Sequence, residues 1–271
     1  MPFDIRSRII EDNLKIHSTE AYYYDILHRE LNNAYTLKNI DDDISLVIKS
    51  CGNPLPRVLD LGSGTGYLTI PFLRKGSSVD AVDMSLEMSK LCKQKVLSLG
   101  LEGRVRFFIS EVEQFLVGLK EEFHVIAISS FLHHLYDYMK VLAELDKHLA
   151  PGGVIFIAWE PTSRRYARFS LPAKIVDFID NKFFRLYMKR HNISIPDTDY
   201  KYADYHANSD KGCDPDAIIA YFKNKGYDVL EFKNFSGIAK SALAARIHNY
   251  FKFSCDHFRI IMKKPGVKSG D

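Results

Sequence analysis

One stretch of this sequence decides its fold, Arg57-Val58-Leu59-Asp60-Leu61-Gly62-Ser63-Gly64-Thr65-Gly66. An apolar run ends in an acid, and glycines that alternate with small polar residues follow it. This pattern predicts a buried parallel strand that turns sharply and opens a helix. Glycines let backbone amides approach a ligand, and a helix N-terminus adds partial positive charge. The stretch therefore predicts a site for a nucleotide-type cofactor.

Strand-like and helix-like segments alternate beyond this stretch. The expected strands are 58–61, 78–82, 105–109, 125–129 and 154–158. The expected helices are 67–75, 86–99, 112–119 and 138–149. Two further strands are expected at 227–235 and 258–264. The rhythm predicts an α/β fold, a doubly wound, Rossmann-like, seven-stranded and mostly parallel sheet with helices on both faces.

We divide the chain into five segments. They are a helical N-terminal cap (1–52), a cofactor-binding core (53–161), an inserted helical lid for substrate recognition (162–212), a C-terminal completion of the sheet (213–265) and a tail expected to be disordered (266–271). Within the cap, 14–31 is expected to be helical, and Asp41-Asp42-Asp43 is expected to cap a second helix that starts at Ile44.

Composition excludes several classes of protein. The chain is 46% hydrophobic and 26% charged, as ordinary folded proteins are, and its net charge of +3 is too small to indicate a nucleic-acid partner. Its four cysteines have neither CxxC nor zinc-site spacing, which predicts reduced thiols, a cytoplasmic location and no metal site. We expect neither a signal peptide nor a bilayer-spanning segment.

The spacing of the glycines narrows the choice of cofactor class. A dinucleotide fingerprint, GxGxxG from Gly62, would need glycine where Tyr67 stands. The second strand ends at Asp83, an acid that can accept hydrogen bonds from ribose hydroxyls. Glu111 follows the third strand, where a side chain can bind the adenine amino group.

These strand ends resemble the class I S-adenosylmethionine-dependent methyltransferases over about residues 57–160 and the two closing strands. The matching motifs are VLDLGSGTG, AVDMS, FFISEVEQF and LAPGGVIFIAWEP. The resemblance implies S-adenosylmethionine as cofactor, with Asp60 near the methionyl ammonium, Asp83 on the ribose and Met84 beside the adenine. Glu111 stands where many relatives carry aspartate. The full expected cofactor set is Asp60, Gly62, Ser63, Gly64, Gly66, Asp83, Met84, Glu111, Val112 and Ser129.

The segment Ser129–Leu135 after the fourth strand resembles the loop of small-molecule and quinone-type methyltransferases. His134 matches the histidine most frequent there and is the candidate catalytic base, with a structural hydrogen bond as the alternative. The candidate substrate-binding residues are His133, Glu160, Tyr205 and His206. The acid constellation of metal-dependent catechol-type enzymes is not evident, and the segments typical of DNA-base and protein-arginine methyltransferases are missing.

The lid segment is rich in aromatic residues that either wall an apolar pocket or form ordinary core. They are Tyr166, Phe169, Phe178, Phe183, Phe184, Tyr187, Tyr200, Tyr202 and Tyr205. Basic residues between Arg164 and Arg190 either meet a membrane surface or an acidic substrate, or form a solvated face. The N-terminal helices, with Tyr22-Tyr23-Tyr24, are expected to close over the cofactor.

The leading hypothesis is in-line methyl transfer from S-adenosylmethionine to a small-molecule acceptor, a largely apolar or aromatic metabolite. Three alternatives stay open: a cofactor-binding protein that acts through an interface without turnover, a lipid or quinone methyltransferase in weak contact with a membrane surface, and a nicotinamide oxidoreductase. The acceptor atom and the oligomeric state are not determined by the sequence.

Overall fold

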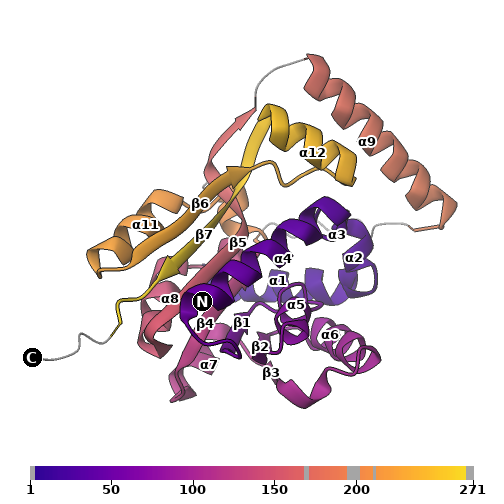
Figure 1. Ribbon diagram of the computed structural model, residues 1–271. Coiled ribbons are helices and arrows are strands. Elements are labelled where there is room, and N and C mark those ends of the chain that lie inside the picture. The colour runs from indigo at the N-terminus through magenta and orange to yellow at the C-terminus, as the bar shows by residue number, and fades with distance from the viewer. Residues whose placement is uncertain (1–3, 168–170, 194–201, 210–211, 267–271) are drawn as a thin grey trace, which may run out of the picture.

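The structure, a computed structural model, describes residues 4–167, 171–193, 202–209 and 212–266 (Figure 1). Its strands are β1 (Arg57–Leu61), β2 (Ser78–Asp83), β3 (Val105–Ile109), β4 (Phe123–Ser129), β5 (Leu149–Ala167), β6 (Asp228–Phe235) and β7 (Ser254–Lys263). They form one seven-stranded sheet in the order β3-β2-β1-β4-β5-β7-β6. Only β7 runs antiparallel to its neighbours β5 and β6 among these described strands. The predicted α/β fold is confirmed.

Strand β1 marks the point where the chain order of the sheet reverses. It pairs in parallel with β2 on one side and with β4 on the other. Because the helices that follow these strands leave in opposite directions, a crevice forms at their carboxyl ends, where ligands bind in such sheets. The glycine stretch lies at this crevice.

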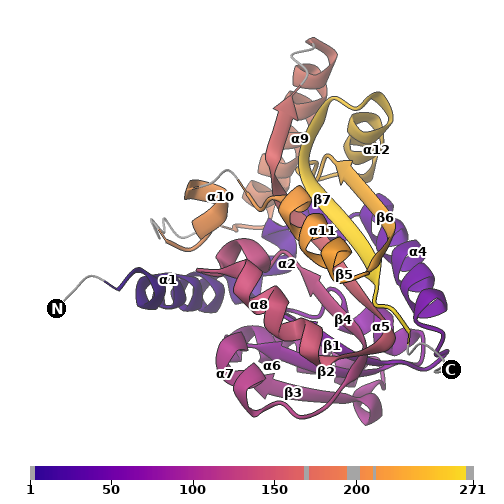
Figure 2. The same ribbon diagram turned by 90° about the vertical axis from the view of Figure 1, so that its left-hand side faces the viewer.

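Helices cover both faces of the sheet (Figures 1 and 2). One face carries α4 (Ala34–Cys51), α5 (Thr69–Arg74) and α6 (Leu86–Ser98); the other carries α7 (Val112–Gly118), α8 (Tyr138–Leu145) and α11 (Pro215–Asn224). In β1, the fully buried Val58 packs with the first group and Leu59 with the second, because successive strand residues face opposite sides. A strand buried on both faces explains the continuous apolar run before Gly62.

The N-terminal segment differs from the prediction in two places. The helix expected over 14–31 is interrupted: α1 (Ile5–Glu20) is followed by a 3₁₀ turn, α2 (Tyr24–Leu27) and α3 (Arg29–Asn32). His28, with ψ of 50°, breaks the helix between α2 and α3. Helix α4 begins at Ala34, because the Asn33 side chain caps it by accepting from the Thr36 N–H.

The predicted acidic cap at Asp41-Asp42-Asp43 is therefore wrong, and these residues lie inside α4. Asp43 is buried and pairs instead with Arg259 of β7. The helix begins directly after Asn33 and continues without a break through the three acids to Cys51, so no cap is needed at Asp41.

The segment after β5 contains α9 (Leu171–Arg190) and α10 (Tyr205–Ser209). Helix α9 lies at the periphery beside α12 (Ala242–Phe251) (Figure 1). Phe178 and Phe183 are each 68% exposed, so the interpretation of these lid aromatics as ordinary core is wrong. Phe169, Tyr200 and the tail residues 267–271 lie outside the described residues. Within the part of the chain that the structure describes, no helix is long and apolar enough to cross a bilayer.

Candidate functional site

The glycine loop after β1 uses its backbone donors inside the protein. The N–H groups of Gly62 and Ser63 donate to the Val82 carbonyl at 2.9 and 3.0 Å, and the Gly64 N–H donates to the Asp83 carboxylate at 2.8 Å. These donors are not free for a ligand, contrary to the expectation from the sequence. A dinucleotide pyrophosphate binds through free backbone amides at such a loop, so the arrangement disfavours that class of cofactor.

Asp83 is held rigidly at the end of β2. One carboxylate oxygen accepts from Gly64, and the other accepts from the Ser85 N–H at 2.8 Å. Burial raises the pKa of this carboxyl above its usual range, and the two backbone hydrogen bonds oppose the shift. Asp83 and Met84 line two cavities, one on each side of them. A ligand that extends from one cavity into the other would therefore pass the Asp83 carboxylate.

The first cavity extends from Asp83 toward β3. Its walls include Ser110, Glu111 and Val112 from the end of that strand. Helix α1 closes it from above: Ile9 and Asn13 line it, and the Arg6 guanidinium donates to Glu111 at 2.9 Å. The contribution of Arg6 could not be found from the sequence, because no motif surrounds it.

The second cavity extends from Gly62 toward β4. It is lined by Ser63, Gly64, Thr65, Tyr67, Ser129 and Tyr24, among others. The Tyr67 hydroxyl and the Ser129 hydroxyl are buried without a hydrogen-bond partner. Asn13, His17 and His134, which also line this cavity, each have a buried polar atom without a partner as well. Buried polar atoms of this kind are rare, and their concentration on one cavity indicates a polar ligand.

Two expected cofactor residues lie behind the loop and do not line these cavities. Asp60 is buried, accepts a hydrogen bond from the Thr69 hydroxyl, and burial raises its pKa to about 7. Gly66 packs against α6, where an added Cβ would lie 2.8 Å from the Cys92 sulfur. Both residues therefore shape the loop from below.

Glu160 organises the loop after β4. Its fully buried carboxylate accepts from the backbone N–H groups of Phe131 and Leu132 at 2.7 and 3.0 Å, and from His133 Nδ1 at 2.9 Å. Ser130 and Trp159, which flank these contacts, both adopt positive φ angles. Such strained backbone clusters at functional sites. The substrate-binding candidate Glu160 thus acts as a positioning residue for the histidine loop.

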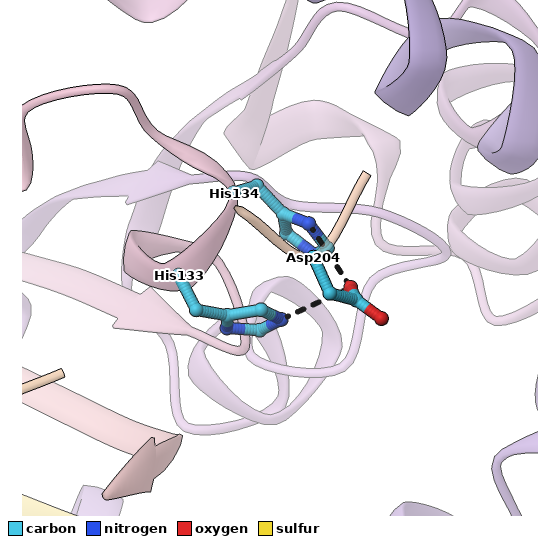
Figure 3. A group of neighbouring side chains, drawn as sticks. All are labelled: His133, His134 and Asp204. Carbon is cyan, nitrogen blue, oxygen red and sulfur yellow. Dashed lines mark ion pairs between the residues drawn. The ribbon is translucent and has the colours of Figure 1, made fainter. Parts of the chain in front are cut away.

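Both histidines of this loop approach Asp204, which lies just before α10 (Figure 3). His133 Nε2 lies 3.6 Å and His134 Nδ1 lies 3.4 Å from Asp204 Oδ1. Burial lowers the pKa of His133, but Asp204 and Glu160 outweigh burial and raise it to about 9. Burial and the neighbouring His133 hold the pKa of His134 well below its usual range. The two histidines therefore favour different charge states.

A third cavity opens on the far side of the histidine loop. Its volume is about 460 Å³, enough for a drug-sized ligand, and it is partly open to solvent. Its walls combine apolar side chains (Leu31, Trp159, Ile238) with titratable ones (His17, Glu20, His28, Glu30, His133, His134, Asp204, Lys240, Asp256, His257).

The candidates Tyr205 and His206 are not among these lining residues. Tyr205 packs against the Tyr136 ring, and His206 packs against the Tyr138 ring. Asp204 takes the place that we expected for them. The sequence offers Asp204 only as one of several polar side chains of the lid, with Tyr200, Tyr205 and His206, and no local motif predicts its approach to the two histidines.

His134 borders all three cavities. Its ring also lies edge-on to His17 of α1, with centroids 5.0 Å apart. A group at this position can contact a ligand in the two cavities beside Asp83 and a ligand in the third cavity at the same time. The geometry thus suits a reaction between two bound molecules.

Comparisons with known proteins point to one family. Residues 58–153 match the family described as "Methyltransferase domain". The ubiquinone biosynthesis O-methyltransferase of Xylella fastidiosa (strain 9a5c) is 29% identical over 123 residues, which cover 45% of this chain and 48% of that protein. The ubiquinone/menaquinone biosynthesis C-methyltransferase UbiE of Wigglesworthia glossinidia brevipalpis is 26% identical over 155 residues, 56% of this chain and 59% of that protein. The chain spans about half the length of the curated relatives it matches.

A solved structure extends the likeness to nearly the whole chain. The crystal structure of magnesium protoporphyrin IX methyltransferase (ChlM) from Synechocystis PCC 6803 with bound SAM has a TM-score of 0.55 and 12% sequence identity. The alignment covers 97% of this chain and 98% of that one. At this identity the likeness concerns the fold alone.

Proposed function

We propose that this chain transfers a methyl group from S-adenosylmethionine to a small-molecule acceptor, because residues 58–153 match the methyltransferase-domain family and the fold is similar to that of a methyltransferase solved with bound SAM. The observation that carries the proposal is the position of His134, which borders the two cavities beside Asp83 and the third cavity. Methyl transfer is an in-line displacement, so the enzyme must align the acceptor atom with the methyl carbon and the sulfur of the bound cofactor.

The cofactor would extend through the two cavities that meet at Asp83. We assign the adenine to the side of Met84, Glu111 and Val112, and the methionine part to the side of Ser63 and Ser129. Asp83 would accept from the ribose hydroxyls. The unpartnered Ser129 and Tyr67 hydroxyls support a polar occupant on the methionine side. Asp60 and Gly66 would act from below, by fixing the loop.

The acceptor would bind in the third cavity. Its apolar walls suit an apolar or aromatic body, and its many titratable groups suit an acceptor that also carries polar substituents. By their printed names, the relatives reported above are methyltransferases of ubiquinone or menaquinone biosynthesis, which supports the same class of acceptor. We propose His134 as the catalytic residue, with Glu160 positioning it. The four cysteines are free, which supports the cytoplasmic location that we propose.

Calorimetric titration with S-adenosylhomocysteine tests the cofactor half of the proposal. We expect one site per chain with micromolar affinity, and no binding by the pure protein would refute it. Incubation with methyl-labelled cofactor and an extract of the source organism, followed by mass identification, tests the transfer half. A cofactor-binding protein without turnover would bind S-adenosylhomocysteine and yield no labelled product.

A membrane-surface version of this function is favoured by one observation. Apolar residues of α9 face solvent, namely Leu171, Ile175, Phe178, Ile179, Phe183 and Leu186. Lys174, Lys182, Arg185, Lys189 and Arg190 are exposed between them. Both acids of α9 are paired: the buried Asp180 accepts from the Lys240 N–H, and the partly exposed Asp177 pairs with His248. A helix with bases and apolar side chains outward fits an anionic lipid surface, from which an apolar acceptor could be drawn.

A further inference from the structure

Three potential metal ligands lie close together in the wall of the third cavity, and Figure 3 shows their side chains. One atom each of His133, His134 and Asp204 lies within 4.8 Å of the others. Two imidazoles and one carboxylate are a donor set typical of divalent transition metals, and three protein ligands leave coordination positions open.

The hydrogen bonds around His133 fix which of its nitrogens is available. Nδ1 lies 2.9 Å from Glu160 Oε2, which is ionisable but acts as an acceptor here, since the same carboxylate also receives the Phe131 and Leu132 N–H groups. The proton of a neutral His133 is therefore on Nδ1, and the Nε2 lone pair points toward Asp204. A buried carboxylate behind a histidine is the arrangement that orients metal-binding histidines.

His134 also directs a nitrogen without a hydrogen-bond partner toward Asp204. Its Nδ1 atom is buried and has no hydrogen-bond partner, although Asp204 Oδ1 lies 3.4 Å away. Two nitrogens and a carboxylate oxygen thus face one another across distances longer than ordinary hydrogen bonds. A positive charge between these atoms stabilises them, and either a metal ion or the second proton of His133 can supply it.

We propose that His133, His134 and Asp204 bind a divalent transition-metal ion, which binds an acceptor hydroxyl in the third cavity. The metal site stands on these three residues, whereas its use in the reaction rests on the proposed methyl transfer. The alternative is a protonated His133 held between Glu160 and Asp204, with no metal.

The metal would change how the acceptor is activated. A hydroxyl bound to a divalent cation releases its proton to water near neutral pH more readily than a free one does. The oxygen lone pair then forms the new C–O bond while the methyl C–S bond breaks, and the electron pair of that bond stays on sulfur. Neutral S-adenosylhomocysteine and a methyl ether result. His134 becomes a ligand in place of the base expected from the sequence.

Cobalt(II) is the probe that tests this site. The full-length protein, freed of metal with a chelator and dialysed, is titrated with Co²⁺ while visible absorption and heat are recorded. We expect one Co²⁺ per chain. Loss of a residue that only orients a ligand typically weakens metal binding by about 10- to 100-fold. Asp204→Asn removes a ligand, so it should weaken Co²⁺ binding by more than that. Asp204 is half-exposed, so the variant should fold. Glu20→Gln, in the same cavity but outside the cluster, should bind Co²⁺ as the unchanged protein does.

Absence of Co²⁺ binding, or equal affinity in the Asp204→Asn variant, would overturn the proposed site. Titration of the same samples with S-adenosylhomocysteine separates this outcome from failure of the proposed function. If S-adenosylhomocysteine binds and Co²⁺ does not, the metal inference alone fails. If Co²⁺ binds and S-adenosylhomocysteine does not, the methyltransferase proposal fails while the metal site stands.

Discussion

The backbone N–H of Gly64 donates a 2.8 Å hydrogen bond to the carboxylate of Asp83. This bond ties the loop after β1 to the end of β2, so the two halves of the predicted cofactor site are mechanically one unit. Asp83 therefore has two tasks, since it holds the loop and lines the cavity on both sides.

Replacing Asp83 should weaken cofactor binding sharply. For Asp83→Ala we expect the affinity for S-adenosylhomocysteine, measured by calorimetry, to fall by roughly 10- to 100-fold, because one charge-assisted hydrogen bond contributes about 1.5–3 kcal/mol. Asp80→Asn is the control: Asp80 lies on the same strand but pairs with Arg57 and Arg106, away from the cavities. Unchanged affinity in Asp83→Ala would remove the ribose assignment.

Gly62→Ala should damage the site more than its size suggests. Gly62 has φ of 68°, and an added Cβ would lie 2.3 Å from Cδ2 of the Phe131 ring. Positive φ in a non-glycine residue costs about 1–3 kcal/mol, and the clash adds to it. We expect a lower melting temperature and loss of S-adenosylhomocysteine binding. Gly103→Ala is a matched control, because its Cβ would meet nothing within 4 Å. Equal behaviour of the two variants would contradict this account of the loop.

Asp60 should make the stability of the ligand-free protein depend on pH. Burial raises its pKa from 3.8 to about 7. Between these values the folded state binds more protons than the unfolded state, so the free energy of unfolding should fall as pH rises from about 4 to about 7. The upper bound of this loss is about 4 kcal/mol.

Asp60→Asn should flatten that dependence, as urea unfolding at pH 5.5 and pH 8 would show. In Thr69→Val the carboxylate loses the hydroxyl that favours its charged form, so the fall should continue to higher pH. The idea does not survive if Asp60→Asn keeps the full pH dependence of the unchanged protein.

The exposed face of α9 should bind anionic vesicles. In flotation with phosphatidylserine-containing liposomes we expect the protein to bind, and the pair Phe178→Ser and Phe183→Ser to reduce partitioning at least about tenfold, since each buried Phe contributes about 1.5–3 kcal/mol. Val117→Ser, on α7, removes a residue that is 90% exposed and should change nothing. Binding that is insensitive to the α9 pair would rule out this face as the contact.

Much of the cofactor site was predictable because each part of it is local. A continuous apolar run, a glycine turn and an acid at a strand end lie within a few residues of one another, and parallel strands bring their carboxyl ends to one edge. Glycine spacing and Asp83 therefore predicted the crevice. The loop donors were misjudged because Val82, which accepts them, lies on a different strand.

The sequence by itself determined the sheet, the position of the crevice and the histidine loop, since periodicity and turn residues act over short stretches of chain. Only the tertiary structure decided that Glu160 lies behind His133, that Arg6 reaches Glu111, and that Asp204 meets both histidines. The glycine loop that predicts the fold thus specifies where a cofactor binds. The acceptor side depends on contacts between segments far apart in the chain, which form because packing of the whole fold brings them together and which no local pattern encodes.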